Sequence, residues 1–207
     1  MIMATEAHAG AGVVLASASA PRRAMLENAG VAVTADPASV DEDEVKRAFK
    51  ADGAGADDCA EALAEMKARR VAARHPDRLV IGADQMLVCG DVWFDKPPDR
   101  DHARAQLLAL RGRTHELIAS CVAFAGGARV WHHTDRARLT VRAFSDGFLD
   151  AYLDRVGDAA LASVGGYQLE GLGAQLFSRV EGDYFTVLGL PLLPLLGYLR
   201  TRGVLIA

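Results

Sequence analysis

The segment Val13–Arg23, VVLASASAPRR, combines hydroxyl and cationic residues at a spacing that suits anion binding. An apolar run breaks into small hydroxyl residues, among them Ser17 and Ser19, and then reaches the adjacent cations Arg22 and Arg23. A helix N-terminus carries unpaired N–H groups and partial positive charge, so a helix that begins here would bind phosphate beside the two arginines. The alternative is an ordinary capped helix with two solvated arginines.

The local elements follow from the same segment. We expect a buried strand over 13–16, a tight turn over 17–21 and a helix over 22–29. Ser19 suits the N-cap of this helix because its hydroxyl can accept a hydrogen bond from an N–H of the first turn. Pro21 suits the first turn, where its missing N–H removes no helical hydrogen bond.

A carboxylate lies inside a second apolar run. Asp84 stands within LVIGADQMLVC, which we expect to form a strand over 79–89. Burying a carboxylate is costly unless it is paired or bound to a metal, so Asp84 is a candidate general base or metal ligand. The alternative is a turn aspartate beside Gly82.

Two lysines are candidate anion ligands. Lys67 shares one face of the helix expected over 57–74 with Leu63 and Val71, so its charge interrupts an apolar stripe. Lys96 lies in the loop sequence DKPP, after a strand. The alternatives are an ammonium group of Lys67 that reaches solvent along its apolar stem, and a solvated loop lysine at 96.

Further acidic residues precede the expected short helix after VDE. Asp41 and Glu42 either interact with the dipole of that helix or join Asp84 in holding a hard cation such as Mg²⁺, which prefers one or two carboxylates with water and phosphate. His115 and Glu116 begin a later strand, and we expect both at the surface. The sequence contains no P-loop, dinucleotide-binding fingerprint or nucleophile elbow.

Composition limits the class of protein. The 207 residues are 51% hydrophobic and 24% charged, which describes a chain able to bury a sizeable core. The net charge of −4 argues against a nucleic-acid polymer as partner. The three cysteines have neither disulfide nor zinc spacing, and no apolar stretch is long enough to span a membrane, so we expect a cytoplasmic protein.

Strands and helices alternate along the chain, which predicts an α/β fold. We expect one domain over 13–203, preceded by an N-terminal extension over 1–12. A hairpin is expected from strands over 114–124 and 128–133, turned at two glycines, with a further strand over 139–144. An apolar helix over 190–199 would close the domain.

Seven motifs occur in an order that resembles the Maf family of nucleotide pyrophosphatases: LASASAPRR, VDE, LAEMKA, IGADQMLV, DKP, GRTHE, and YQLEGLGA with VEGDYFTVLGLPL. The similarity covers about residues 13–200. It implies a two-lobed α/β domain of the Maf and ITPase type, with a central mixed sheet flanked by helices, a deep nucleotide cleft and a tendency to form homodimers. It also implies hydrolysis of a nucleoside triphosphate to a monophosphate and pyrophosphate with a divalent metal cation, Mg²⁺ or Mn²⁺. This hydrolysis would remove modified nucleotides.

The resemblance also implies roles for individual residues. Asp84 matches the proton acceptor of the family, and Glu42 matches an acidic residue that would hold the metal together with Asp84. The phosphate-binding set is matched by Ser17, Ser19, Arg22, Arg23, Lys67 and Lys96. Two departures stand out, because Ala20-Pro21 replaces the single proline of the common form SPRR and Thr186 stands where asparagine is usual.

Base preference is the finest point that the resemblance addresses. Gln85 and Glu170, with Arg22, match positions that vary with substrate, and the pair resembles the 7-methyl-GTP branch of the family. A carboxylate only accepts hydrogen bonds, so Glu170 suits the N–H donors of guanine. Relatives in that branch carry an aromatic residue before the two arginines, where this chain has Pro21. Broader nucleotide hydrolysis is one alternative, and a non-catalytic nucleotide sensor that regulates cell division and septum formation is another.

Overall fold

The computed structural model describes residues 12–207, so the extension expected over 1–12 lies outside the described residues except for Gly12. The elements in chain order are β1 Val13–Leu15, α1 Ala20–Asn28, β2 Val33–Ala35, α2 Glu42–Ala51, α3 Ala56–Ala72, β3 Val80–Cys89, β4 Val92–Phe94, α4 Arg100–Leu110, β5 Thr114–Ala125, β6 Ala128–Val141, α5 Asp146–Val156, the 3₁₀ turns η1 Gly157–Leu161, η2 Val164–Gly166 and η3 Leu172–Leu176, β7 Phe177–Glu181, α6 Tyr184–Val187 and α7 Leu192–Thr201.

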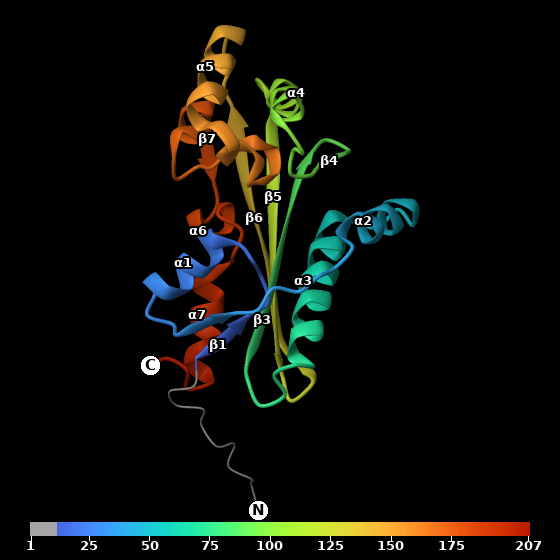
Figure 1. Ribbon diagram of the computed structural model, residues 1–207, viewed down its shortest axis with the longest axis vertical. Coiled ribbons are helices and arrows are strands. Elements are labelled where there is room, and N and C mark those ends of the chain that lie inside the picture. Colours follow the sequence, from blue (N-terminus) through green and yellow to red (C-terminus); the bar gives the residue numbers. More distant parts are fainter. Residues whose placement is uncertain (1–11) are drawn as a thin grey trace, which may run out of the picture.

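The strands form one mixed sheet of seven in the order β2-β1-β3-β5-β6-β7, with β4 paired to β3. β1 runs parallel to β2 and β3, whereas β3, β5, β6 and β7 pair antiparallel. Figure 1 shows α1 and α7 on one side of the long strands, α3 on the other, and α4 and α5 at the upper end. The predicted α/β fold with a central mixed sheet flanked by helices is confirmed.

Two apolar clusters divide the molecule into lobes. One lies between β1 and β3 and the helices α1 and α7, and it contains Leu26, Ile81 and Leu195. The other lies at the upper end, where Leu87 packs with residues of α4, α5 and the ends of β5 and β6. β3 therefore passes from one lobe to the other, and Asp84 stands at the junction. A cleft of about 730 Å³ opens there, lined from both lobes.

Several boundaries differ from those predicted. α1 begins at Ala20 rather than at residue 22, although Ser19 is the N-cap and Pro21 lies in the first turn as predicted. The strands expected over 128–133 and 139–144 are one continuous strand, β6. The intervening residues 134–138, TDRAR, lack the apolar alternation that predicts a strand. Their two arginines lie at the surface of the sheet, where they pair with Glu116 of β5 and Asp57 of α3.

Helix length and the state of the cysteines can be compared with the expectations from composition. Within residues 12–207 the longest apolar helices are all too short to cross a membrane. Cys59, Cys89 and Cys121 are free thiols and are buried. Burial raises the pKa of Cys59 to about 11 and that of Cys121 to about 12, so both stay protonated at neutral pH.

Candidate active site

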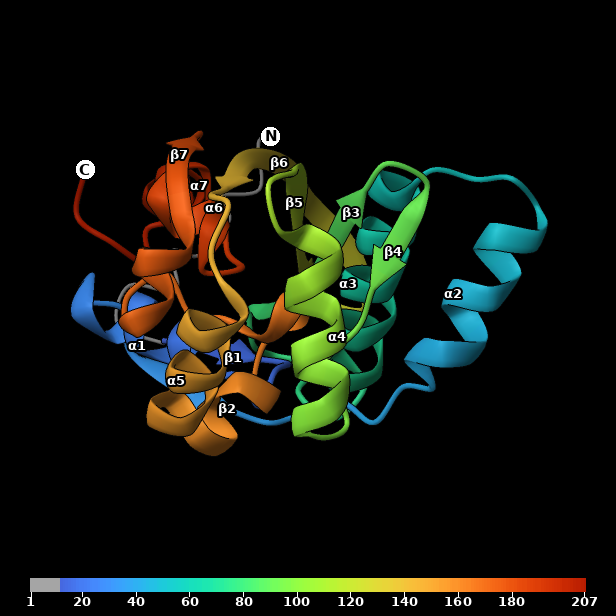
Figure 2. The same ribbon diagram turned by 90° about the horizontal axis from the view of Figure 1, so that it is seen from above.

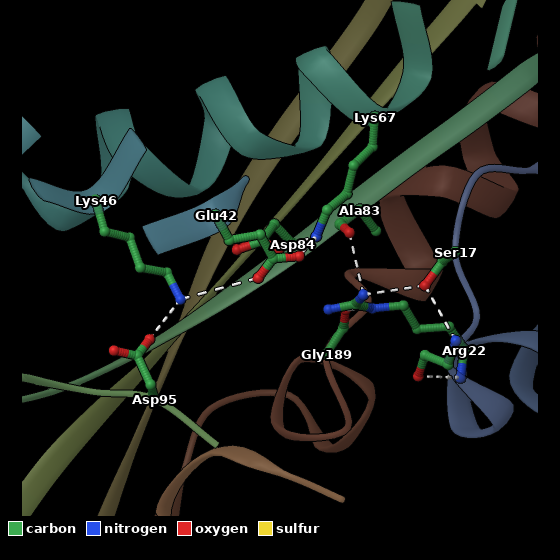
Figure 3. Close-up of polar contacts among 10 residues, drawn as sticks. Ser17, Arg22, Glu42, Lys46, Lys67, Ala83, Asp84, Asp95 and Gly189 are labelled. Atoms are coloured by element: carbon green, nitrogen blue, oxygen red, sulfur yellow. Dashed lines mark hydrogen bonds and ion pairs between the residues drawn. The ribbon is translucent and has the colours of Figure 1, made fainter. Parts of the chain in front are cut away.

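The turn between β1 and α1 folds one arginine back over the cleft. Ser19 accepts a hydrogen bond from the backbone N–H of Arg22 (3.4 Å). The Arg22 guanidinium donates from Nε to the carbonyl of Gly189 (2.7 Å), and from Nη1 to the carbonyl of Ala83 (3.0 Å) and to Ser17 Oγ (3.3 Å) (Figure 3). Burial lowers the pKa of Arg22, while the nearby Asp84 carboxylate opposes that shift. Backbone contacts thus fix a cation at the cleft.

The second arginine lies elsewhere. Arg23 is exposed, and its Nε donates to Glu27 one turn along α1 (2.7 Å). It is not among the residues that line the cleft, unlike its neighbour Arg22. Adjacent helical residues point about 100° apart, so a helix can direct only one of two neighbouring arginines into the same cavity.

The floor of the cleft is a three-residue ion cluster. The Lys67 ammonium group lies 2.5 Å from Asp84 Oδ1 and 2.6 Å from Glu42 Oε1. Lys67 is 8% exposed and Asp84 4% exposed, so the alternative in which the lysine reaches solvent is wrong. Gly82 allows this approach, because a Cβ at that position would clash with the Ala64 carbonyl of α3. The residues come from α2, α3 and β3.

One oxygen of this cluster is free to bind something else. Asp84 Oδ2 is buried and has no hydrogen-bond partner among the described residues. Burial raises the pKa of Glu42, but the charges of Lys67, Lys46 and Lys96 outweigh it and leave that pKa lowered, so Glu42 is ionised. No group of three or more histidine, cysteine or acidic residues suited to a metal occurs within residues 12–207. Two carboxylates fit a hard divalent cation whose other ligands are water and phosphate.

Lys46 joins this cluster, and the sequence reasoning missed it. Its ammonium group lies 2.5 Å from Asp95 Oδ1 and 3.9 Å from Glu42 Oε2. Burial lowers the pKa of Lys46, but the hydrogen bond to Asp95 more than compensates, so the pKa is raised. The available signal was its position four residues after Glu42 on one helical face. Lys96, the predicted lysine of the next loop, is exposed and lines the same cleft.

The side of the cleft away from the ion cluster carries Gln85. Its Nε2 donates to the carbonyls of Thr186 and Val187, each at 3.0 Å. Both hydrogens of the Gln85 amide are therefore engaged in these hydrogen bonds. The remaining polar atom, Oε1, can only accept a hydrogen bond from a ligand. Glu170 is exposed and also lines the cleft. A carboxylate there would offer a ligand hydrogen-bond acceptors only.

A buried histidine contacts Tyr167, which lines the cleft. His115 is 1% exposed, so its predicted surface position is wrong. Its Nε2 hydrogen-bonds the Tyr167 hydroxyl at 2.6 Å, and Tyr167 lines the cleft. Burial lowers the pKa of His115 to about 4, so the ring is neutral at physiological pH. The GRTHE motif gave no indication of this burial. The histidine is the second residue of β5, and its side chain faces the core.

Comparison with known proteins identifies the family. Residues 12–202 match the family described as Maf-like protein. The chain belongs to the Maf family. It is 60% identical over 193 residues to a nucleoside triphosphate pyrophosphatase of Paramagnetospirillum magneticum, covering 93% of this chain and 100% of the relative. It is 50% identical over 193 residues to a 7-methyl-GTP pyrophosphatase of Mesorhizobium japonicum, covering 93% of this chain and 97% of the relative.

The two departures from the Maf pattern have different surroundings. Pro21 lines the cleft and leaves no aromatic ring there. Thr186 is completely buried, and its hydroxyl donates to Asp135 Oδ2 of β6 at 3.3 Å. Because the Thr186 carbonyl also accepts a hydrogen bond from Gln85 Nε2, this threonine connects β6 to Gln85.

Proposed function

We propose that this Maf protein is a nucleoside triphosphate pyrophosphatase that hydrolyses the bond between the α- and β-phosphates. The observation that carries the proposal is the buried Asp84, with one oxygen held by Lys67 and the other unpartnered, in a cleft that also holds Arg22. A cleft of about 730 Å³ lies within the range of small-molecule sites. The names of the relatives at 50–60% identity support the same reaction class.

The residues divide the reaction between them. Asp84 Oδ2 accepts a proton from the water that attacks the α-phosphorus, while Lys67 holds Oδ1 and fixes the orientation of the carboxylate. The new bond joins the water oxygen to phosphorus, and the bond to the pyrophosphate oxygen breaks. The cations that stabilise the phosphates in this step are Arg22, Lys67 and Lys96, with Ser17 and Ser19 as hydroxyl donors. Arg23 is left out because its side chain pairs outside the cleft.

Glu42 and Asp84 are the residues that would hold a divalent metal, Mg²⁺ or Mn²⁺. Ionised Glu42 fits such an ion as a direct ligand, and Asp84 Oδ2, which must stay free to take the proton, would contact it through a water molecule. When bound, the ion neutralises phosphate charge and so stabilises the leaving pyrophosphate. Calorimetric titration of Mg²⁺ into the wild-type protein and into Glu42→Gln tests the assignment without relying on turnover. Equal metal affinity in both would remove Glu42 from the metal site.

The deciding experiment uses isotopic water. Hydrolysis in H₂¹⁸O places the label in the nucleoside monophosphate if water attacks the α-phosphorus, and in pyrophosphate if it attacks the β-phosphorus. We expect pyrophosphate as product and label in the monophosphate. Release of single phosphate would refute the bond assignment. Nucleotide binding without turnover would favour the alternative of a non-catalytic nucleotide sensor in cell division.

For the base, we propose a preference for 7-methyl-GTP. Gln85 and Glu170 both present acceptors to the cleft, which suits the N1–H and N2 donors of guanine, and methylation at N7 adds a positive charge that favours a carboxylate. The double variant Gln85→Thr with Glu170→Gln should shift preference toward pyrimidine triphosphates. The measurement is kcat/KM for 7-methyl-GTP, dTTP and UTP. A wild-type protein that already prefers dTTP or UTP would contradict this preference.

A further inference from the structure

Lys46 is unusually enclosed for its helix. α2 contains no buried residue, and the next basic residues along it, Arg47 and Lys50, are exposed. The side chain of Lys46 is only 12% exposed, because it turns toward the cleft, which it lines together with Asp95. Figure 2 shows α2 at the edge of the molecule, outside α3. The lysine is thus a cation that a peripheral helix directs inward.

Asp95 holds this cation from the opposite side of the cleft mouth. The residue follows β4 and precedes Lys96, and its Oδ1 lies 2.5 Å from Lys46 Nζ. Figure 3 shows the ammonium group of Lys46 between Asp95 and Glu42. Asp95 is half exposed, so the pair is in contact with solvent and can exchange partners at small cost.

We propose that Lys46 is an exchangeable phosphate ligand, held by Asp95 in the free protein and transferred to the terminal phosphates when a triphosphate binds. This inference rests on the proposed function. Lys67 contacts both Asp84 and Glu42, whereas Lys46 is 3.9 Å from Glu42 and reaches outward to Asp95. With the α-phosphate next to Asp84, Lys46 therefore meets the phosphates farther along the chain. A triphosphate carries several negative charges and outcompetes one exposed carboxylate.

If the exchange occurs, substitutions at Lys46 and at Asp95 change triphosphate affinity in opposite directions. Removing Lys46 deletes a phosphate ligand and weakens triphosphate binding. Removing the charge of Asp95 deletes the competitor and tightens it. A purely structural ion pair predicts the same sign for both substitutions, because either one would loosen α2 and the loop after β4.

The experiment measures binding of an α,β-methylene triphosphate analogue and of the corresponding monophosphate by calorimetry. Lys46→Met should weaken binding of the triphosphate analogue ~10-fold, the usual scale for one hydrogen bond between charged groups. Asp95→Asn should tighten it ~3-fold, the scale of an exposed ion pair. The double variant should match Lys46→Met, and monophosphate affinity should stay constant throughout. Lys50→Met, on the same helix and over Trp93, is the matched control and should bind as wild type.

Two outcomes overturn the inference. One is weaker binding in Asp95→Asn as well as in Lys46→Met, and the other is unchanged triphosphate affinity in Lys46→Met. Lys46→Arg, which keeps the charge, should bind more tightly than Lys46→Met, and thermal unfolding of each variant separates lost folding from lost binding. Pyrophosphate release by the wild-type protein tests the proposed function independently, so wild-type turnover with unchanged Lys46→Met binding rejects only the role of Lys46.

Discussion

The two walls of the cleft are held by different forces. The ion-paired wall consists of Glu42, Lys46, Lys67, Asp84 and Asp95, whose side chains contact one another as charges. The hydrogen-bonded wall consists of Ser17, Arg22, Gln85 and Tyr167, which hydrogen-bond backbone groups, neutral side chains and, for Ser17, the Arg22 guanidinium. Arg22 is the one charge in that second wall, and its described contacts are two carbonyls and a hydroxyl.

This difference suits the walls to different parts of the proposed function. Backbone carbonyls cannot move without moving the fold, so the hydrogen-bonded wall presents donors and acceptors in fixed directions. In the ion-paired wall, the solvent-exposed pair of Lys46 with Asp95 can exchange its partner, as proposed above for triphosphate binding. Fixed geometry suits the proposed roles of Gln85 at the base and of Ser17 and Arg22 at the phosphates, whereas exchangeable charge suits the proposed binding of a polyanion and the release of pyrophosphate.

Neutralising Asp84 is the largest expected break in the ion-paired wall. Asp84→Asn keeps the shape of the side chain and removes the proton acceptor, so turnover should fall by ~10²–10⁴, the range for loss of a general base. Nucleotide binding should largely survive. The measurement is single-turnover pyrophosphate release with binding measured in parallel, and Asp77→Asn, an exposed aspartate in a turn, is the control. Near-normal turnover in Asp84→Asn would remove Asp84 from this role.

Removing Lys67 tests whether the ion pairs also stabilise the fold. If Lys67 were only a phosphate ligand, Lys67→Met would weaken binding with little change in stability. The buried contact with Asp84 changes that expectation, because the carboxylate would lose its partner at a cost of about 3 kcal/mol in the free energy of unfolding.

Denaturant unfolding checks the Lys67 prediction, with Arg69→Met on the exposed face of the same helix as control. Adding Asp84→Asn to Lys67→Met removes the unpaired charge and should restore part of the lost stability. If Lys67→Met unfolds at the same denaturant concentration as wild type, the pair contributes nothing to stability.

Local patterns predicted the hydrogen-bonded start of the site well. The apolar run, the Ser19 cap and Pro21 fixed the strand-turn-helix unit, and the apolar positions around Lys67 showed that its charge interrupts an apolar helical face. The proposal that Arg22 binds phosphate rests on chemistry that is local in the sequence, and the structure places its guanidinium at the cleft. What local patterns lacked was direction, since nothing in the pair Arg22-Arg23 says which guanidinium turns inward.

Long-range contacts account for what was missed. Lys46 becomes a site residue only because Asp95, 49 residues away in the chain, meets it across the cleft mouth. His115 is buried in the upper lobe, where its ring hydrogen-bonds the hydroxyl of Tyr167, 52 residues later in the chain. Both are charged or polar residues in polar stretches, where hydrophobic periodicity carries no signal. The fold class was predictable from the sequence, but these tertiary pairings were not.

The neutral pair of His115 and Tyr167 gives the hydrogen-bonded wall its own pH dependence. The unfolded chain takes up a proton on His115 as pH falls below about 6.5, whereas the folded protein does so only near its lowered pKa of about 4. The unfolded state therefore binds more protons in this window, and stability decreases as pH falls, by about 2 kcal/mol between pH 6.5 and pH 5.

Comparison with His115→Gln isolates the contribution of this group to the pH dependence. Glutamine can still hydrogen-bond the Tyr167 hydroxyl but does not titrate. Denaturant unfolding at several pH values should show a smaller loss of stability for the variant than for wild type. Parallel curves for the two proteins would mean that another group causes the pH dependence.

The smallest expected effect tests how firmly the hydrogen-bonded wall is fixed. Thr186→Val keeps the side-chain shape but removes the hydroxyl that donates to Asp135, and so loosens the turn whose carbonyls hold both amide hydrogens of Gln85. Gln85 can then rotate and offer its N–H₂ group, which should lower the preference for guanine over pyrimidine triphosphates by ~5-fold, the scale of one net hydrogen bond. The measurement is the ratio of kcat/KM for 7-methyl-GTP and UTP, and Thr186→Ser, which keeps the hydroxyl, should restore the wild-type ratio. An unchanged ratio in Thr186→Val, together with lower thermal stability, would make Thr186 a structural residue with no part in reading the base.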